Sequence, residues 1–482
     1  MGEKAAVSLE VSLSHEAIAG PPLKKDVVIG SLRQRLWHAG GWSVLSHAST
    51  QLIRLAGNVL LARFLMPEAF ALSTVVMLLT VGLTLFSDLG VFQNVVRHPD
   101  AENRRFLDTA WSVQVLRGVV IWLVALGVAA CLPWLVRAGW VRADTVYADP
   151  RLPWMIAVAT FSAVFQGFES TQVLVERRHM RLKRLTQIEL ASQVVASVLM
   201  VTVAWFTRSV WAFVVGGLCA AALRCIWTHR VLGGPANRWA WDAHVLRDLV
   251  GFGKWVFLSS VLFYLVSNSD RLILSNLIDS TSFGLYSIGF LLATAPGLVM
   301  NTLAGSVALP TLSEVIRERP HDLVRVLAEF QRLSDGFLGP MVGLLWSLGP
   351  FIVGFFYDAR YQPAGAILSS LAWGVAANRY VVLEQCYLAM GQPQMLTLVN
   401  AVRFVCAFIG IPLAFQFAGF EGALAVIVLT QYTGWPFAVY FKIRNKLFDW
   451  RTELLSIPWL ALGLMIGSMT NFMLKTLGWG AA

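Results

Sequence analysis

Acidic residues are scarce in this chain, and charged residues of either sign are few. Only 28 of its 482 residues are Asp or Glu, and charged residues make up 14% of the total. Hydrophobic residues make up 57%, and the mean hydropathy is +0.64. A soluble protein of this length would expose too much apolar surface at that composition. The shortage of charge therefore excludes an ordinary soluble domain and predicts a polytopic helical membrane protein.

Cysteine is also rare, and the motifs of common enzymes and metal sites are missing. The five cysteines form no CxxC or Cys/His pattern, so we expect no metal site and interpret them as small buried residues. The sequence has no phosphate-binding glycine loop, no paired acids on a long loop and only scattered histidines. No basic tract with interleaved aromatic residues indicates nucleic-acid binding. These absences predict a protein that is not an enzyme and that has no cofactor.

What the chain does contain is a series of apolar segments of about 20 residues, the length that crosses a bilayer as a helix. They lie near 42–63, 70–91, 108–131, 153–175, 186–206, 210–229, 252–275, 283–305, 333–356, 364–389, 395–416, 421–441 and 453–474. The fold class that follows is an all-α membrane protein of about thirteen transmembrane helices. We assign twelve of them to a core and the last to an extra helix.

Lysine and arginine are concentrated on one set of connections between these spans. With the N-terminus in the cytosol, 26 of the 38 fall on cytosolic segments, seven on outer segments and five inside spans. Cytosolic loops of membrane proteins carry this excess of positive charge. The asymmetry therefore predicts a cytosolic N-terminus.

The sequence repeats itself at an offset of 213 residues without gaps. The matches include Trp42 with Trp255, Ser46 with Ser259, Phe70 with Phe283, and several leucines. Six helices separate the copies, so the copies run in the same direction across the membrane and predict two six-helix lobes related by a parallel pseudo-twofold axis around a central cavity. The expected parts are a basic cytosolic tail (1–40), an N-lobe (41–230), a cytosolic linker (231–250), a C-lobe (251–442) and a C-terminal extra helix (443–482).

Five arginines lie inside apolar spans, one on each of five helices. They are Arg54, Arg117, Arg271, Arg379 and Arg403. A guanidinium at bilayer depth costs roughly 2.5 kcal/mol on insertion scales, so it is expected to face a partner or a water-filled cavity. Few acids lie at matching depth, and we therefore predict a cationic cavity for a large anion. A snorkelling side chain or a pair with an acid is the alternative for each, and for Arg117 above all.

Polar residues accompany several of these arginines at helical spacing. Gln51, Arg54 and Asn58 share one face of the first span, and Asn268 and Arg271 share a face of the seventh. Asn400 precedes Arg403 by three residues in the eleventh. We predict that these side chains line the cavity. The alternative for the uncharged ones is a stripe of hydrogen bonds between helices.

Three acids are candidates for gating or for coupling to a cation, either Na⁺ or H⁺. Asp88 ends the second span, Asp270 adjoins Arg271, and Glu384 follows Arg379 by five residues. Neighbours on a helix point about 100° apart, so Asp270 is not expected to face Arg271. The alternatives are an interfacial acid for Asp88 and a packing ion pair for Asp270.

Several short motifs resemble those of the oligosaccharide flippases, or polysaccharide transporters, of the multidrug/oligosaccharidyl-lipid/polysaccharide superfamily. The stretch Leu61-Ala62-Arg63-Phe64-Leu65-Met66-Pro67-Glu68-Ala69-Phe70-Ala71-Leu72 is similar to that family's turn between the first two helices, with Ala71 in place of its usual glycine. Phe86-Ser87-Asp88-Leu89-Gly90 resembles its end of helix two, and Asn268-Ser269-Asp270-Arg271 its signature in helix seven. The resemblance extends over about residues 40–445.

This resemblance implies a substrate and a mechanism. The substrate would be a polyprenyl-pyrophosphate-linked oligosaccharide, moved from the inner to the outer leaflet of a bacterial cytoplasmic membrane for exopolysaccharide or O-antigen biosynthesis. Two six-helix lobes would alternate access, and cationic side chains would hold the pyrophosphate or an acidic sugar. Partners to expect are anionic lipids and the polymerase and export machinery.

Two other function classes stay open at this point. A cation-coupled drug antiporter of the same superfamily would favour acids over arginines in the cavity. A membrane polysaccharide polymerase would be expected to show a long extracytoplasmic loop or a catalytic His/Asp motif, and the sequence shows neither. A scaffold protein is the other possibility, but the polar stripes on several spans would then have no function.

Overall fold

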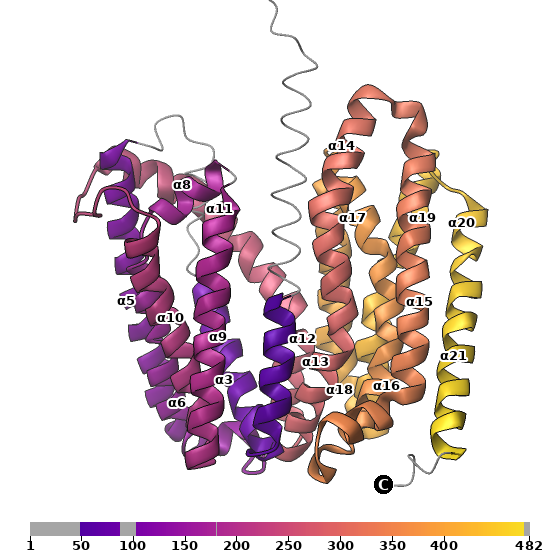
Figure 1. Cartoon of the computed structure of the whole chain (residues 1–482), viewed down its shortest axis with the longest axis horizontal. Coiled ribbons are helices and arrows are strands. Elements are labelled where there is room, and N and C mark those ends of the chain that lie inside the picture. Colours follow the sequence, from indigo (N-terminus) through magenta and orange to yellow (C-terminus); the bar gives the residue numbers. More distant parts are fainter. Residues whose placement is uncertain (1–48, 87–102, 180, 477–482) are drawn as a thin grey trace, which may run out of the picture.

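The computed structural model describes residues 49–86, 103–179 and 181–476. The regular elements within these three ranges are all helices, and none is a strand. Figure 1 shows two bundles of upright helices side by side, an N-lobe in indigo to magenta and a C-lobe in salmon to yellow. The all-helical prediction is confirmed.

The N-lobe is built from one helix over 49–62 and the elements that follow it. These are α3 (Pro67–Phe86), α5 (Arg104–Arg137), η1 (Val146–Ala148), α6 (Leu152–Ala159), α7 (Ser162–Gly167), α8 (Gln172–Arg178), α9 (Leu182–Thr207) and α10 (Trp211–Val231). Then α11 (Ala243–Ser267) leads toward the C-lobe. It begins inside the segment predicted as a linker and contacts α3 and α5 as well as α18 of the other lobe.

The C-lobe holds the remaining elements. These are α12 (Ser269–Leu277), α13 (Ser280–Leu303), η2 (Ala304–Ala308), α14 (Leu309–Glu318), η3 (Pro320–Asp322), α15 (Leu323–Phe356), η4 (Ala359–Tyr361), α16 (Ala364–Val375), η5 (Ala376–Tyr380), α17 (Val381–Ala389), α18 (Pro393–Tyr432), α19 (Trp435–Arg444), α20 (Trp450–Leu454) and α21 (Ser456–Thr476). The chain reverses inside α18 at Ala418 and Gly419, where Gly419 has φ +62°. This turn separates the predicted eleventh and twelfth spans.

Nine helical stretches in the described ranges are long and apolar enough to cross a membrane. One of them, Pro393–Arg444, contains both sides of the turn in α18, and the first span is described only from residue 49. The chain is therefore a multi-pass membrane protein. The count of thirteen spans stays a prediction.

The fourth span is not the continuous helix over 153–175 that the sequence predicted. It consists of α6, α7 and α8, with turns between them. Close packing on α5 accompanies the turns: a Cβ on Gly118 would lie 2.5 Å from the carbonyl oxygen of Ala163, and one on Gly167 would lie 2.7 Å from that of Gln114. Apolar content marks a span but does not reveal such turns.

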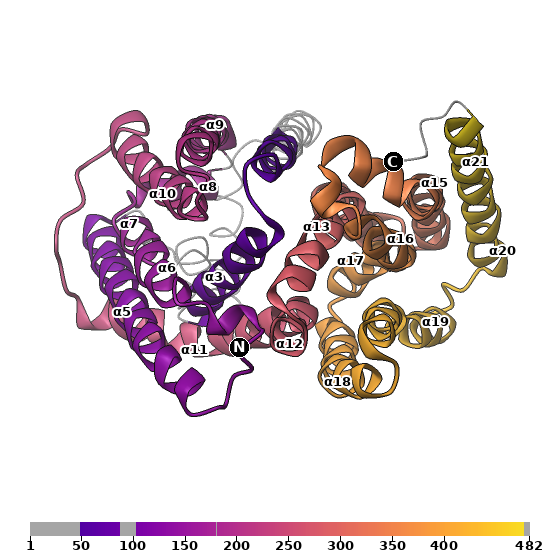
Figure 2. The same cartoon turned by 90° about the horizontal axis from the view of Figure 1, so that it is seen from below.

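The predicted extra helix, α21, packs along α15 at the outer edge of the C-lobe (Figure 2). Glycines allow the two backbones to touch. A Cβ on Gly343 would lie 1.9 Å from the carbonyl carbon of Gly463, and one on Gly467 would lie 2.4 Å from the carbonyl oxygen of Gly343. Small residues at four-residue spacing form such interfaces between membrane helices.

The lobes meet along α3 and α13, and residues in equivalent positions of the two sequence copies contact each other there. Thr74 Oγ1 donates to Ser287 Oγ at 3.1 Å, and Thr281 Oγ1 donates to Glu68 Oε1 at 2.5 Å. Each pair is 213 residues apart, which is the offset of the repeat. Equivalent residues meet only near a twofold axis, so these contacts agree with the predicted pseudo-twofold arrangement.

Further polar contacts join the lobes at the lower end in Figure 1, where α3, α13 and α16 begin. Tyr361 Oη donates to the Leu65 carbonyl at 2.9 Å, Arg360 Nη2 donates to the Ala62 carbonyl at 3.2 Å, and the Tyr147 and Ser275 hydroxyls are 3.0 Å apart. The hydrogen bond and the charge of Arg360 hold the pKa of Asp358 below its usual range, so this ion pair persists at neutral pH. We refer to these contacts, with Glu68–Thr281, as the lobe clasp.

Candidate functional site

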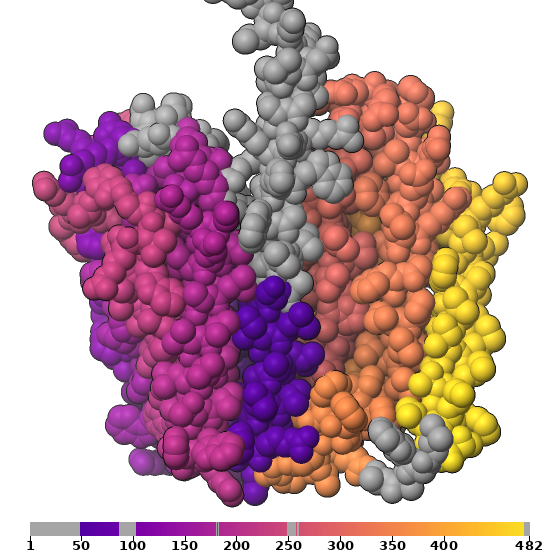
Figure 3. Space-filling view, in the orientation of Figure 1, coloured from indigo at the N-terminus to yellow at the C-terminus, as the bar shows by residue number. Residues whose placement is uncertain are grey.

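A cavity of about 720 Å³ lies between the lobes. Its walls come from the helix over 49–62, α3, α6, α7, α9, α10, α13 and the junction of α11 with α12. Figure 3 shows the indigo segment that begins at residue 49 between the magenta helices of the N-lobe and the orange C-lobe. The first span therefore forms one wall of this cavity at the interface of the lobes.

The polar stripe of the first span faces this cavity. Gln51, Arg54 and Asn58 all line it, while Leu52 on another face of the helix is 66% exposed on the protein surface. No hydrogen bond or ion pair of Arg54 is found among the residues that the structure describes. Arg54 and Arg271 lie close enough to repel each other. Arg54 from the N-lobe and Arg271 from the C-lobe thus face the same cavity.

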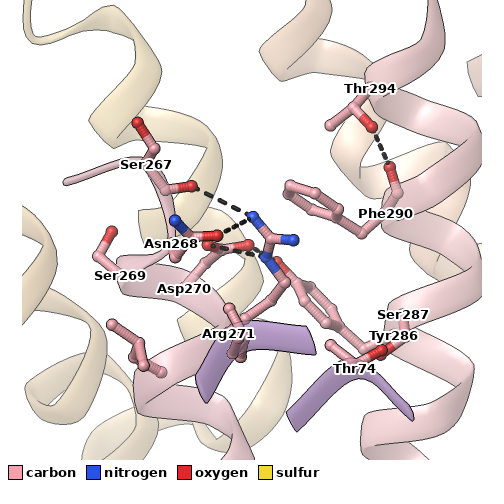
Figure 4. A network of polar contacts seen from close by, with 12 residues as sticks. Thr74, Ser267, Asn268, Ser269, Asp270, Arg271, Tyr286, Ser287, Phe290 and Thr294 are labelled. Atoms are coloured by element: carbon pink, nitrogen blue, oxygen red, sulfur yellow. Dashed lines mark hydrogen bonds and ion pairs between the residues drawn. The ribbon is translucent and has the colours of Figure 1, made fainter. Parts of the chain in front are cut away.

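The second of these, Arg271, sits just after a break between α11 and α12. Asn268 has non-helical angles there, φ −124° and ψ 12°. Its side-chain oxygen accepts a hydrogen bond from Arg271 Nη2 at 2.6 Å, and the Ser267 carbonyl lies 3.3 Å from the same nitrogen (Figure 4). The Arg271 guanidinium also lies over the Phe290 ring, 4.5 Å from its centroid. These contacts hold the side chain against the cavity wall.

Asp270 is buried behind Arg271 rather than exposed to the cavity. Tyr286 Oη donates a hydrogen bond of 2.5 Å to Asp270 Oδ2. The expectation that Asp270 and Arg271 do not face each other is wrong, because Asp270 Oδ1 lies 3.9 Å from Arg271 Nε. The helix begins anew at Ser269, so this pair occupies its first turn, where side chains follow the break rather than a regular helix.

The charged side chains in the described lining of the cavity are all positive. Among the described residues that line it are Arg54 and Arg271, amides, hydroxyls and apolar side chains, and none of these is Asp, Glu or Lys. Low-dielectric walls strengthen the field of these two cations, of which only Arg271 has an acid nearby, Asp270 behind it, among the described residues. The cavity is thus suited to an anion with a sizeable polar portion.

Arg379 does not face this cavity, and the prediction that it does is corrected. Its Nε lies 2.8 Å from Asp335 Oδ1 and its Nη1 lies 3.0 Å from Glu453 Oε2. It borders a separate space of about 540 Å³ within the C-lobe. Lys442, assigned to a cytosolic segment by its sequence position, is buried beside it and bonds Glu453 and Gln331. The alternative that the sequence left open, a pair with an acid, describes Arg379, although the sequence did not identify Asp335 and Glu453 as its partners.

Arg117 also lies outside the cavity between the lobes. It borders a polar pocket inside the N-lobe, where its Nη2 donates to the Thr84 carbonyl at 2.5 Å. Glu169 and Arg224 form an ion pair of 3.1 Å in the same pocket. The prediction that Arg117 lines the cavity between the lobes is therefore corrected.

Three further candidates, Arg403, Asn400 and Glu384, are not part of the cavity lining. Arg403 and Asn400 lie on α18 and Glu384 on α17, and Arg403 is near enough to Glu384 for attraction. Asp88 lies outside the described residues. Of the nine predicted substrate-binding residues, the structure brings five together in one place: Gln51, Arg54, Asn58, Asn268 and Arg271. Sequence reasoning missed Gln193, Ser197, Tyr286 and Phe290, which have no charge to mark them.

Comparisons with known proteins identify the family. A family model described as polysaccharide biosynthesis protein matches residues 60–366. The chain belongs to this family. The resemblance seen in its motifs is thereby confirmed, together with its class as a membrane protein of polysaccharide biosynthesis.

Three curated relatives support this assignment. The teichuronic acid biosynthesis protein TuaB of Bacillus subtilis is 21% identical over 333 residues, which are 66% of each chain. The succinoglycan biosynthesis transport protein ExoT of Rhizobium meliloti is 21% identical over 69% of this chain and 64% of its own. The lipopolysaccharide biosynthesis protein WzxC of Escherichia coli is 19% identical over 59% and 56%. The matches to TuaB and ExoT span slightly less than two thirds of those proteins.

Solved structures with the same fold include two transporters of related type. An inward-facing multidrug resistance MATE family transporter of the MOP superfamily matches with a TM-score of 0.66 and 11% identity, over 84% of this chain and 98% of its own. The lipid II flippase MurJ, in an inward closed conformation, matches with a TM-score of 0.66 and 13% identity, over 90% and 99%. At these identities the likeness establishes the fold. ExoT is named as a transport protein and the two structural neighbours as a transporter and a flippase. This is the class that the sequence predicted, and it is not a class of catalytic enzymes.

Proposed function

We propose that the protein is a flippase for a polyprenyl-pyrophosphate-linked oligosaccharide. It moves this lipid from the inner to the outer leaflet of a bacterial cytoplasmic membrane, for exopolysaccharide or O-antigen biosynthesis. One observation carries the proposal: Arg54 and Arg271, from different lobes, face the same cavity, and its described lining contains no acid. Pyrophosphate is the charged group of such a lipid, and arginine is suited to bind phosphate oxygens in pairs.

The uncharged lining suits the sugar portion of the substrate. Gln51, Asn58, Gln193 and Ser197 offer donors and acceptors on the N-lobe side, and Thr294 offers a hydroxyl on the C-lobe side. Sugar hydroxyls pair with such groups without needing charge. In this proposal the arginines hold the headgroup and the amides tolerate several sugars.

Alternating access would use the lobe clasp as its outer gate. With the N-terminus in the cytosol, as the charge asymmetry predicts, the clasp lies on the outer side of the membrane. Release of the glycan would require Tyr361, Arg360 and Thr281 to give up their bonds to the N-lobe. Coupling to a cation through Asp88, Asp270 or Glu384 is part of the proposal. Of the two that lie in the described part of the chain, Asp270 and Glu384, the former contacts a cavity arginine.

The test is a lipid extraction from cells that lack this protein, with mass analysis of polyprenyl-linked oligosaccharides. We expect a completed oligosaccharide to accumulate on its lipid carrier. The intact gene should remove the accumulation, Arg54→Lys should remove part of it, and Arg54→Ala should not remove it although the protein is present in the membrane.

Other outcomes point elsewhere. Loss of polysaccharide without accumulation of the lipid-linked precursor would indicate polymerisation or scaffolding. Normal levels of both would favour the cation-coupled antiporter. Full activity of Arg54→Ala would show that the cavity does not act through its arginines.

A further inference from the structure

The break between α11 and α12 leaves the last carbonyl groups of α11 in need of partners. The backbone N–H of Asn268 and its side-chain Nδ2 both donate to the Tyr264 carbonyl, at 3.0 Å and 2.9 Å. The Ser267 carbonyl lies 3.3 Å from Arg271 Nη2. A cation at the C-terminal end of a helix is favoured by the helix dipole. Arg271 therefore acts as the cap of α11.

The same guanidinium is fixed from behind by α13. Tyr286 is fully buried and holds Asp270, whose other oxygen approaches Arg271 Nε. Phe290, one turn further along α13, lies under the guanidinium plane (Figure 4). Nε itself has no hydrogen-bond partner among the described residues. Two residues of α13 and one of α12 thus set the direction of Arg271.

The break also lies where a helix passes from one lobe to the other. On its N-terminal side, Tyr264 Oη donates to the Leu78 carbonyl of α3 at 2.7 Å, and its ring packs on Gly82. On its C-terminal side, α12 packs mostly against α13 and α18 of the C-lobe, and it also contacts α3 and η1 of the N-lobe. A change in the angle at Asn268 would therefore shift α12 and the C-lobe helices packed on it relative to α3.

We propose that Arg271 is a ligand-sensitive cap: with the cavity empty it stabilises the break in the seventh span, and when it binds the pyrophosphate it releases the break. This rests on the proposed function of Arg271 as an anion-binding residue. Asn268 is then a positioning residue that competes with the ligand for Nη2, and not a ligand of the substrate.

The physical basis is a limit on the donors of one nitrogen. Nη2 carries two N–H groups, and both are directed at Asn268 Oδ1 and the Ser267 carbonyl. Phosphate oxygens that take these donors leave the end of α11 without its cap. The first N–H groups of α12 lack partners in their own helix. Joining α11 and α12 into a continuous helix would satisfy both ends at once.

The experiment uses the full-length protein in lipid nanodiscs and inorganic pyrophosphate as the probe. Hydrogen exchange of the segment 264–272 is measured with and without saturating pyrophosphate, and affinity is measured by calorimetry at constant ionic strength. We expect amides 269–271 of the wild type to exchange on the order of tenfold more slowly with pyrophosphate, as a continuous helix protects them.

Two variants of Asn268 should change affinity in opposite ways. Asn268→Leu removes the competing oxygen, so exchange should already be slow without ligand and affinity should stay or rise. Asn268→Asp places a carboxylate against Arg271, so affinity should fall on the order of tenfold, the factor that a charge-assisted hydrogen bond provides. Asn301→Leu is the matched control, because Asn301 makes the same bond to the carbonyl four residues earlier, Gly297, away from the cavity.

Each outcome of these measurements either supports or overturns the role of Arg271 as a ligand-sensitive cap. Binding of pyrophosphate without a change in exchange would overturn the switch and leave the flippase proposal intact. A loss of affinity in Asn268→Leu would make Asn268 a direct ligand and would also overturn it. If pyrophosphate does not bind to the wild type, Arg271 is not an anion-binding cap. The flippase proposal would then depend on the lipid extraction with Arg54→Ala alone. Unfolding temperatures of all variants, compared with Asn301→Leu, separate these effects from misfolding.

Discussion

Two arginines inside the membrane, Arg271 and Arg379, differ in what surrounds them. Arg379 is enclosed by Asp335 and Glu453, with Lys442 beside them, so its charge is compensated within the C-lobe. Arg271 has one carboxylate at 3.9 Å, that of Asp270, and otherwise amide, carbonyl and ring contacts, and it borders the cavity. A compensated guanidinium supports the fold, whereas a partly compensated one can bind an anion.

This difference gives a prediction for stability. Arg379→Gln leaves two buried acids with only Lys442 as a cation, and removing one partner of a buried ion pair costs ~3–5 kcal/mol. We expect a lower unfolding temperature in detergent and less protein in the membrane. Arg54→Gln, which removes no visible ion pair, is the control and should stay within about 0.5 kcal/mol of the wild type. Equal stability of the two variants would refute the compensated role of Arg379.

The sequence could reveal part of this site and not the rest. Gln51, Arg54 and Asn58 share a helix face, and three- and four-residue spacing is enough to place them together. The partners of Arg379 are 44 and 74 residues away, and spacing along one helix carries no information about them. The same limit hid Tyr286, which reaches Asp270 from the next helix.

At the scale of elements, the spacing of residues along the sequence likewise does not show where a helix breaks or which helices pack together. Apolar length indicated the spans, but not the three short helices of the fourth span or the break at Asn268. The glycines at 339, 343, 463 and 467 are visible in the sequence at four-residue spacing, yet only the structure shows that the two sets face each other. This contact makes α21 part of the C-lobe.

Replacing a glycine in that contact should detach the last helix. Gly463→Leu places a side chain where the Gly339 carbonyl oxygen lies 2.3 Å from the Cβ position, and such overpacking costs ~1–3 kcal/mol. We expect a lower unfolding temperature and faster proteolysis of the segment 445–456. Gly354→Leu on α15, where no atom lies within 4 Å of the Cβ position, is the control. Unchanged proteolysis in Gly463→Leu would show that α21 is not held by this contact.

At the scale of the whole molecule, the lobes are joined at one end by the lobe clasp. Its bonds come from connections between helices and from helix ends, so they can break without unfolding either lobe. The family and the helical fold were predictable because they depend on apolar length and on short local motifs. The clasp was not, because its bonds join segments between 128 and 298 residues apart.

Locking the clasp should stop transport. Cysteines at Glu68→Cys and Thr281→Cys, joined by a short bifunctional thiol reagent from outside the cell, would hold the lobes together where Thr281 now bonds Glu68. We expect the lipid-linked oligosaccharide to accumulate after cross-linking, with no accumulation in either single-cysteine protein. Continued export by the cross-linked protein would exclude separation of the lobes at this point.

The contacts Thr74–Ser287 and Glu68–Thr281 join residues that correspond to each other in the two sequence copies. They bear on the depth at which an anion in the cavity would reach Arg54 and Arg271. With the 213-residue offset that these contacts share, Arg54 corresponds to Ser267, and Asn58 corresponds to Arg271. If the parallel twofold axis and the cytosolic N-terminus predicted from the sequence hold, corresponding residues lie at the same depth, and Arg271 lies one helical turn, about 6 Å, nearer the outer surface than Arg54. In the proposed flippase the two cations would then form successive steps across the membrane, and a phosphate group moving outward through the cavity would pass from the N-lobe arginine to the C-lobe arginine.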